Sequence, residues 1–312
     1  MRVDLEVASR LASKLKGLEL RPSGFDDPRL YPSRDLELEL QASYFLFMCS
    51  IDHRTGARFR GVVEGEELRG SELLWRLGRL KLDEDPRFFT ARSMAKVTAA
   101  EVASWLTVRW PRPAVVKGPG LRALLLRDAA RWLIKLYGGY VTNLLERAND
   151  SCARLVELLR PFKAFNDPVA KKPFLLVKFL ERRGIMRVAD PENLEVPVDN
   201  HLTRIALRTG LIEAPGEALR PDLGLDVRLR MAVRVGFKRV CVEAGVKPTV
   251  LDDVLWSLGR EVCTRRAARC EAKATIHGLG EVRGCPLRGA CRGYVEAELR
   301  RLREPQVATW WY

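Results

Sequence analysis

The residues of this sequence best suited to chemistry are four cysteines clustered in its last fifty residues. Seven cysteines occur in all, and the last four are spaced as C-x6-C-x14-C-x5-C. In a reducing compartment such a cluster favours a metal site over disulfides. Four thiolates bind either a zinc ion or an iron–sulfur cluster, and the spacing leaves both open. The candidate ligands are Cys263, Cys270, Cys285 and Cys291, and His277 in the middle interval is either a substitute ligand or an exposed loop residue.

A second candidate is Asp199, at the start of residues 198–211, which read VDNHLTRIALRTGL. Apolar residues recur on one face of this stretch at helical spacing, and Arg204 and Arg208 form a basic stripe. Aspartate is a favoured N-cap, because its carboxylate accepts backbone N–H bonds. By itself, therefore, Asp199 predicts a capped helix.

The pattern V-D-x-H-x-x-R-x-x-x-R-x-G-L resembles the catalytic-aspartate segment of the helix-hairpin-helix DNA glycosylases, the superfamily of endonuclease III and MutY-type adenine glycosylases. The cysteines resemble the C-x6-C-x2-C-x5-C pattern of the same group, and the flanks CTRRAARC and CPLRGAC look like the family's own. Only the middle interval differs, and it is twelve residues longer. The resemblance implies that Asp199 acts at the sugar carbon that carries the base. It also implies a four-iron four-sulfur cluster, with zinc as the alternative.

Residues 162–180, FKAFNDPVAKKPFLLVKFL, occupy the place of the family's hairpin, typically L-P-G-V-G-x-K. In that alignment Lys172 matches the lysine nucleophile of the lyase members, and Lys171 becomes a phosphate contact. The hairpin is degenerate, because Pro168 and Ala170 replace both glycines. The archaeal 8-oxoguanine glycosylases also deviate here, so the chain resembles an atypical, archaeal-like member. A solvated helix start is the alternative for both lysines.

Asp52 and His53 follow a very apolar segment at 37–50. By position they match the family residues that enter the base pocket, although the family's usual glutamine is missing. The alternative is a loop pair that only caps the preceding element.

The charge balance favours a polyanionic partner. Lys and Arg total 54 against 40 Asp and Glu, which gives a net charge of +14 and a pI near 9.7. Together with the resemblance this predicts double-stranded DNA as the partner, although a generally basic soluble protein is possible. The residues expected to contact DNA are Lys171, Arg204, Arg265, Arg266, Arg269 and Arg288, although some of the arginines could simply keep the cysteine loop soluble.

No apolar run is long enough for a membrane span, and the first twenty residues lack the apolar core of a signal peptide. We therefore expect a monomeric, cytoplasmic protein associated with the nucleoid. Only five Asn and two Gln occur, while 30% of residues are charged, which is typical of a thermophilic source.

Apolar residues recur at intervals of three and four, which predicts an all-α protein. We expect two helical subdomains with a cleft between them. One is a helical barrel over 45–185 that contains the hairpin at 162–180. The other joins 1–44 to 186–312 and carries the Asp199 helix and the cysteine loop.

The implied function is DNA base excision repair by an N-glycosylase, a hydrolase that flips a damaged or mispaired base out of the duplex before excising it. Asp199 stabilises the cationic sugar, and an attack by Lys172 adds AP-lyase activity. Residues 133–168 also resemble the queuosine-salvage hydrolases, which cleave a free nucleotide, so a nucleotide N-glycosidase is one alternative. A non-enzymatic DNA-binding iron–sulfur protein is the other.

Overall fold

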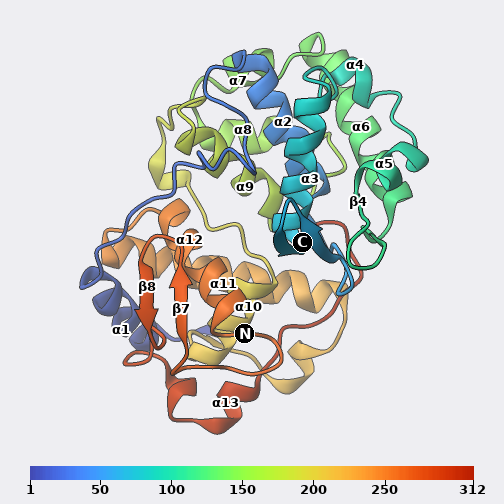
Figure 1. The fold of residues 1–312 in the computed structure, drawn as a ribbon. Coiled ribbons are helices and arrows are strands. Elements are labelled where there is room, and N and C mark those ends of the chain that lie inside the picture. The colour runs from blue at the N-terminus through green and yellow to red at the C-terminus, as the bar shows by residue number, and fades with distance from the viewer. The chain divides into compact units, whose positions relative to one another are not determined.

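The computed structural model describes all 312 residues and consists of thirteen α-helices with four small two-stranded sheets (Figure 1). The all-α prediction is therefore confirmed. The chain forms two compact units. Unit 1 comprises Met1–Ser23 and Pro191–Thr309, and unit 2 comprises Gly24–Asp190 and Trp310–Tyr312. The predicted boundary at residue 45 falls inside a helix of unit 2.

Unit 2 holds most of the helices. They are α2 (Leu38–Ile51), α3 (Ser71–Glu84), α4 (Ala91–Met94), α5 (Ala99–Trp105), α6 (Pro119–Tyr137), α7 (Val141–Ala148), α8 (Cys152–Leu158) and α9 (Lys171–Arg182). Two antiparallel hairpins accompany them, β2 (Arg60–Val63) with β3 (Glu66–Arg69), and β4 (Thr107–Val108) with β5 (Ala114–Val115).

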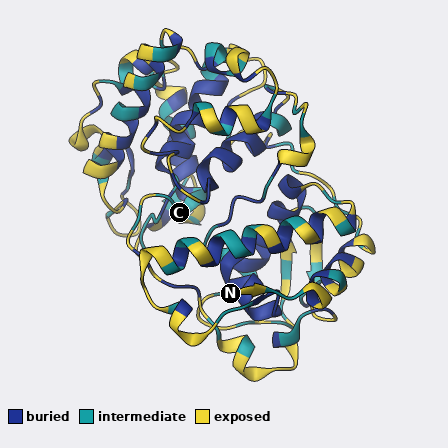
Figure 2. Ribbon diagram, turned by 180° about the vertical axis from the view of Figure 1, so that it is seen from behind, coloured by how far each residue is buried: buried dark blue, intermediate teal, exposed yellow.

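The core of unit 2 is built around α2, which is buried over nearly its whole length (Figure 2). A helix that is apolar on all sides must be enclosed by others, and α2 packs against α6, α7 and α9. Gly78 of α3 allows a close approach, because a Cβ there would lie 2.5 Å from Met48 Cε. The apolar segment at 37–50 is helical almost from its start, since α2 begins at Leu38. This element ends directly at Asp52 and His53 and so sets their positions.

Unit 1 contains α1 (Leu5–Lys16), α10 (Asn200–Thr209), α11 (Leu223–Ala244), α12 (Pro248–Glu261) and α13 (Ala297–Arg301), with three short 3-10 turns at Pro191–Asn193, Gly216–Leu219 and Arg292–Tyr294. Two antiparallel pairs complete it, β1 (Arg2–Val3) with β6 (Ile212–Glu213), and β7 (Lys273–Ile276) with β8 (Gly280–Arg283). Helix α10 lies in the interior, packed on α11 and α12. Gly259 of α12 permits the close approach of α10, because a Cβ at this position would lie only 2.6 Å from His201 Cβ.

Three segments depart from a simple succession of helices. Residues 97–109 form the short α5 and then β4, because the Pro-rich loop at 111–113 folds Ala114–Val115 back onto Thr107–Val108. Residues 162–170 are turns, and only α9 follows them, so a single helix occupies the place of the hairpin expected at 162–180. The long middle interval of the cysteine segment forms the β7–β8 hairpin. Strands of two to four residues are too short to produce a clear alternation in the sequence.

No helix is both long enough and apolar enough to cross a membrane.

Candidate functional site

Lys172 stands at the start of α9, where a turn of unusual backbone geometry positions it. Ala170, the N-cap residue, has a left-handed conformation with φ of 54°. In the turn before it, Asp167 Oδ1 accepts a hydrogen bond from Val169 N at 2.8 Å. The Asn-Asp-Pro sequence favours such a turn. The first turn of α9 thereby directs the side chain of Lys172 into the core of unit 2.

The Lys172 side chain is completely buried, and its amine has two hydrogen-bond partners. Nζ lies 2.6 Å from Ser50 O and 3.3 Å from His53 Nδ1. Burial, together with the positive charges of Lys171 and Arg122, lowers the pKa of Lys172 well below its ordinary value. The lowered pKa favours the neutral amine, which is the form able to act as a nucleophile.

His53 lies between Lys172 and a buried arginine that the sequence reading missed, Arg122. Arg122 NH1 is 3.2 Å from His53 Nδ1, NH2 donates to His53 O at 2.6 Å, and NH1 also donates to Ile51 O. Burial first, and then the charges of Lys172 and Arg122, lower the pKa of His53 well below its ordinary value. His53 is thus a neutral imidazole beside an amine whose pKa is lowered, and burial lowers the pKa of Arg122 to about 10.

Asp52 has a different environment from its neighbour His53. Its carboxylate accepts hydrogen bonds from Ser71 Oγ at 3.0 Å and Trp75 Nε1 at 3.1 Å. Its carbonyl oxygen accepts one from Lys171 Nζ at 3.3 Å. Asp52 therefore ties α2 to α3, as the loop-cap alternative anticipated. Lys171 is buried and its amine contacts Asp52 O in this arrangement, so its side chain is not placed for the predicted contact with DNA.

Asp167 is a second buried residue of this cluster that the sequence reading missed. Its side chain is 7% exposed, and Oδ2 has no hydrogen-bond partner. Burial raises the pKa of Asp167 to about 6 from an ordinary 3.8, against the opposing effects of the Val169 N–H and the charge of Lys172. In the sequence only the Asn-Asp-Pro turn signal marked this position. A carboxyl group with such a raised pKa, close to a buried lysine whose own pKa is lowered, is typical of functional sites.

We expect Asp167→Asn to raise the free energy of unfolding at pH 7 by about 2–3 kcal/mol, since each pKa unit corresponds to about 1.4 kcal/mol. The native pKa lies above the unfolded one, so the charged carboxylate costs stability above pH 6 and nothing below pH 4. Asparagine removes the charge and can still accept the Val169 N–H. Urea unfolding of both proteins at pH 4 and pH 7 measures this, and a gain of equal size at both values would contradict it.

In unit 1, Asp199 is the N-cap of α10, as its sequence position predicts. Oδ1 accepts hydrogen bonds from His201 N at 2.7 Å and Leu202 N at 3.0 Å. Its carbonyl oxygen accepts one from Thr203 Oγ1 at 2.7 Å. Oδ2 has no hydrogen-bond partner, and the residue is half-buried. The cap thus holds one carboxylate oxygen in place and leaves the other available.

Two buried arginines of α10 fix the helix against the cysteine segment. Arg204 donates to Cys263 O and Gly259 O, each at 2.7 Å, and forms an ion pair with Glu304 at 3.0 Å. Arg208 NH1 donates to Thr264 O at 2.9 Å. Both side chains are almost fully buried. Arg204 is therefore not placed for the predicted contact with DNA.

The four candidate ligand cysteines line one small cavity beside α10. Arg208 NH1 lies 3.4 Å from Cys263 Sγ, and Cys291 Sγ donates to Arg208 O at 3.6 Å. Burial raises the pKa of Cys285 to about 12 and of Cys291 to about 11. No three His, Cys, Asp or Glu side chains of the chain are grouped closely enough to hold a single metal ion. Four thiols around one cavity are the donor set that either a zinc ion or an iron–sulfur cluster would use.

The long interval between the second and third cysteines does not separate them, because their backbones are joined by hydrogen bonds. Cys285 N donates to Cys270 O at 2.7 Å, and Gly284 N donates to Ala272 O at 3.1 Å. The β7–β8 ladder continues directly from these bonds. The insertion is therefore a ribbon that begins and ends at the paired cysteines, so it needs no displacement of either.

The other four predicted DNA contacts are arginines of the cysteine segment. They differ in whether the side chain already has a partner within the protein. Arg265 pairs with Glu304 at 3.1 Å, and Arg269 donates to Glu261 O at 2.6 Å. Arg288 pairs with Glu271 at 3.3 Å. Arg266 is exposed and has no partner.

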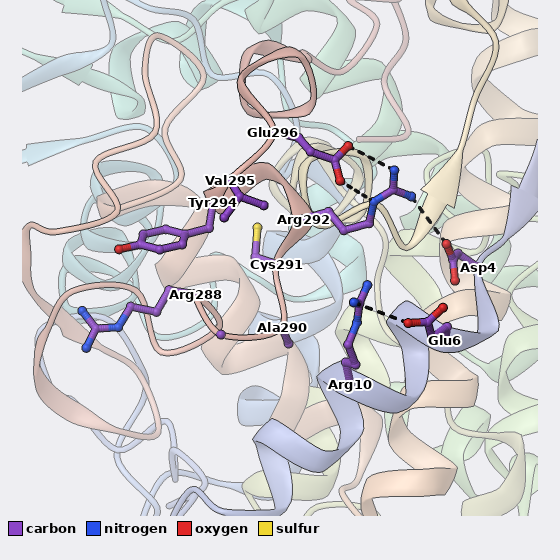
Figure 3. A pocket seen from close by; sticks show the side chains of 11 residues that line it. Asp4, Glu6, Arg10, Arg288, Ala290, Cys291, Arg292, Tyr294, Val295 and Glu296 are labelled. Atoms are coloured by element: carbon purple, nitrogen blue, oxygen red, sulfur yellow. Dashed lines mark hydrogen bonds and ion pairs between the residues drawn. The ribbon is translucent and has the colours of Figure 1, made fainter.

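A pocket of about 600 Å³ lies on the other side of Cys291 (Figure 3). Arg292 pairs with Glu296 at 2.8 Å, and Arg10 with Glu6 at 3.5 Å, so the charges of its wall are largely balanced. None of the predicted catalytic side chains lines it. We therefore do not assign it to the substrate.

Comparisons with known proteins gave two similarities. A family model described as queuosine salvage protein matches residues 52–191, less than half of the chain. The match includes His53 and Lys172 and ends before Asp199. A solved structure, 8-oxoguanine DNA glycosylase from Pyrobaculum aerophilum in complex with 8-oxoguanosine, is similar at 17% identity, with 83% of this chain and 90% of that chain covered and a TM-score of 0.44. A search of curated proteins found no match.

Proposed function

We propose that the protein is an N-glycosidase that cleaves the bond between a base and its sugar in DNA. The observation that carries the proposal is the buried Lys172 amine, whose pKa is lowered, beside a neutral histidine. A lysine removed from water without a carboxylate partner is costly to fold, and a neutral amine is what covalent catalysis at a sugar carbon requires.

In this proposal Lys172 is the nucleophile. With His53 in its Nε2–H form, assigned from the surrounding contacts, the amine donates one N–H to Ser50 O and one to His53 Nδ1. Its lone pair then remains for attack on the anomeric carbon, and the attack requires the nucleotide to displace the side chains that enclose Nζ. As the new N–C bond forms, the bond to the base breaks, the amine proton moves to His53, and the departing base takes a proton from water. This step leaves the sugar joined to Nζ with its ring closed. When the ring opens, the C1′–O4′ bond breaks, O4′ takes the proton from His53, and the C=N bond of a protonated Schiff base forms, which permits strand cleavage.

Asp199 is proposed to stabilise the positive charge that develops on the sugar. The resemblance to the glycosylases assigns this role, and the geometry is compatible with it because Oδ2 is not used by the cap. A carboxylate already fixed by two backbone N–H groups needs no reorganisation as that charge appears.

We further propose that the four cysteines bind one four-iron four-sulfur cluster. When bound, such a cluster would crosslink the segment from Cys263 to Cys291, and no catalytic step is assigned to it. Arg208 would supply a hydrogen bond to the Cys263 sulfur. Zinc is the alternative that the four thiols also permit.

Protein purified without oxygen should accordingly be brown and contain about four iron atoms per chain. Cys285→Ser should lose most of the iron, whereas Cys241→Ala, at a buried cysteine outside the cavity, should keep it. Metal analysis and the visible spectrum measure both. A colourless protein with one zinc per chain would exclude the cluster.

The choice of DNA over a small substrate rests on charge. The net charge of +14 and the arginines of the cysteine segment favour a polyanionic substrate. Binding a free nucleotide requires neither the high net charge nor these arginines. The match of residues 52–191 to the queuosine salvage model favours the second candidate, a nucleotide N-glycosidase. The Lys172 cluster lies in the matched stretch, so the same chemistry serves either substrate.

The proposal is tested with a set of duplexes that each carry one damaged or mispaired base. Chromatography of the reaction should show release of a free base from at least one of them, and a heat-inactivated sample should show none. If no duplex loses a base, the DNA substrate is wrong.

A further inference from the structure

The β7–β8 hairpin, the insertion in the cysteine segment, has two different faces. The paired residues Ala274 and Val282 lie on the side that is partly buried, and Ile276 is buried. Strand β7 packs on α12 (Figure 1). Since side chains alternate across a strand, the residues opposite these point away from α12. Those outer residues are Lys273, Thr275, Glu281 and Arg283, all of them exposed.

Two like charges stand directly opposite each other on the outer face. Lys273 pairs with Arg283 in the register of the ladder. Side chains in such a pair are neighbours, with Cβ atoms about 5 Å apart, and like charges there are destabilising. Neither cation has an ion-pair or hydrogen-bond partner, and Glu281 on the same face does not reach them. The arrangement lacks a negative partner within the protein.

The hairpin is held firmly enough to present these charges at a fixed place. Its turn is tied down by His277 N, which donates to Ser257 Oγ at 2.9 Å, and by Arg21 N, which donates to Gly278 O at 2.8 Å. Its base continues into the hydrogen bond between Cys285 and Cys270. Lys273 and Arg283 lie at this base, so their backbone is anchored on both sides.

We propose that Lys273 and Arg283 bind the phosphate backbone of duplex DNA, so that the insertion is a phosphate clamp added to the cysteine segment. This inference rests on the proposed DNA substrate. Two adjacent cations, one of them a guanidinium fork, match the charge and hydrogen-bonding needs of neighbouring phosphates. The phosphates supply the missing negative charge. Contact is confined to the base of the hairpin, because Glu281 repels phosphate nearer the turn.

The test is the salt dependence of binding to an undamaged duplex by Lys273→Ser/Arg283→Ser. Each phosphate contact contributes about 0.9 to the slope of log affinity against log salt, so the variant should lose about 1.8 from the slope. Its melting temperature should not fall. The matched control is Arg92→Ser/Lys96→Ser, which removes two exposed, unpaired cations from unit 2 and should keep the wild-type slope.

Glu281→Gln gives a change of opposite sign, because removing the repulsion should tighten binding at low salt. The proposal is overturned if the hairpin variant binds with the wild-type slope, or if its loss is no greater than that of the control. Base release is measured separately. A protein that excises no base but shows the slope change refutes the proposed function alone, and one that excises bases with an unchanged slope refutes the clamp alone.

Discussion

Lys172→Gln should abolish trapping of a covalent protein–DNA complex by borohydride. The trap reduces a Schiff base, and glutamine has no amine to form one. Gln is of similar length and can still donate a hydrogen bond to Ser50 O, so the core should survive. Base release can continue through water at a lower rate. Gel separation of the trapped complex from free DNA measures the effect.

Lys171→Gln is the matched control, since it removes the neighbouring lysine, whose amine contacts Asp52 O rather than His53. It should keep the trapped complex. Trapping by Lys172→Gln at the wild-type level would show that another amine forms the Schiff base, and would remove Lys172 from the mechanism.

Asp199→Asn should lower the rate of base release by about 10²–10³, the typical loss when a group that stabilises transition-state charge is removed. Asparagine is nearly as good an N-cap as aspartate, so α10 should stay folded and DNA should still bind. Single-turnover rates at saturating protein separate this chemical effect from binding.

Asp222→Asn provides the control for capping alone. Asp222 is the N-cap of α11 and accepts a hydrogen bond from Leu225 N at 2.8 Å, so the same exchange is made at a second cap. Base release by this variant should match wild type. If Asp199→Asn also excises at the wild-type rate, Asp199 is only a cap.

The sequence predicted those parts of the candidate site that depend on local signals. Asp199 opens α10 because an N-cap residue precedes residues with helical spacing, and both signals lie within a few residues. Likewise, the cysteines converge on one cavity because their outer intervals are short.

The Lys172 cluster could not be predicted in this detail, because its members are distant in the sequence. His53 and Lys172 are 119 residues apart, and His53 and Arg122 are 69 apart. Nothing in the residues around Arg122 in the sequence indicated that its side chain is buried.

Exposure was the other property that the sequence did not reveal. Arg204 and Lys171 are basic residues at helical spacing, which suited DNA contact, yet both side chains are enclosed. Charge alone does not distinguish an exposed arginine from one that ties a helix to backbone carbonyls. Lys273, in contrast, is exposed because the outer face of a two-stranded hairpin has no covering element.

The most direct test of the central claim compares base release from two kinds of substrate with one protein preparation. Lesion-bearing duplexes and the free queuosine nucleotide are incubated in parallel, and the specificity constants for base release are measured. The proposed function predicts release from at least one duplex, little from the free nucleotide, and loss of release with Asp199→Asn. Release from the nucleotide alone, or from neither substrate, would contradict it.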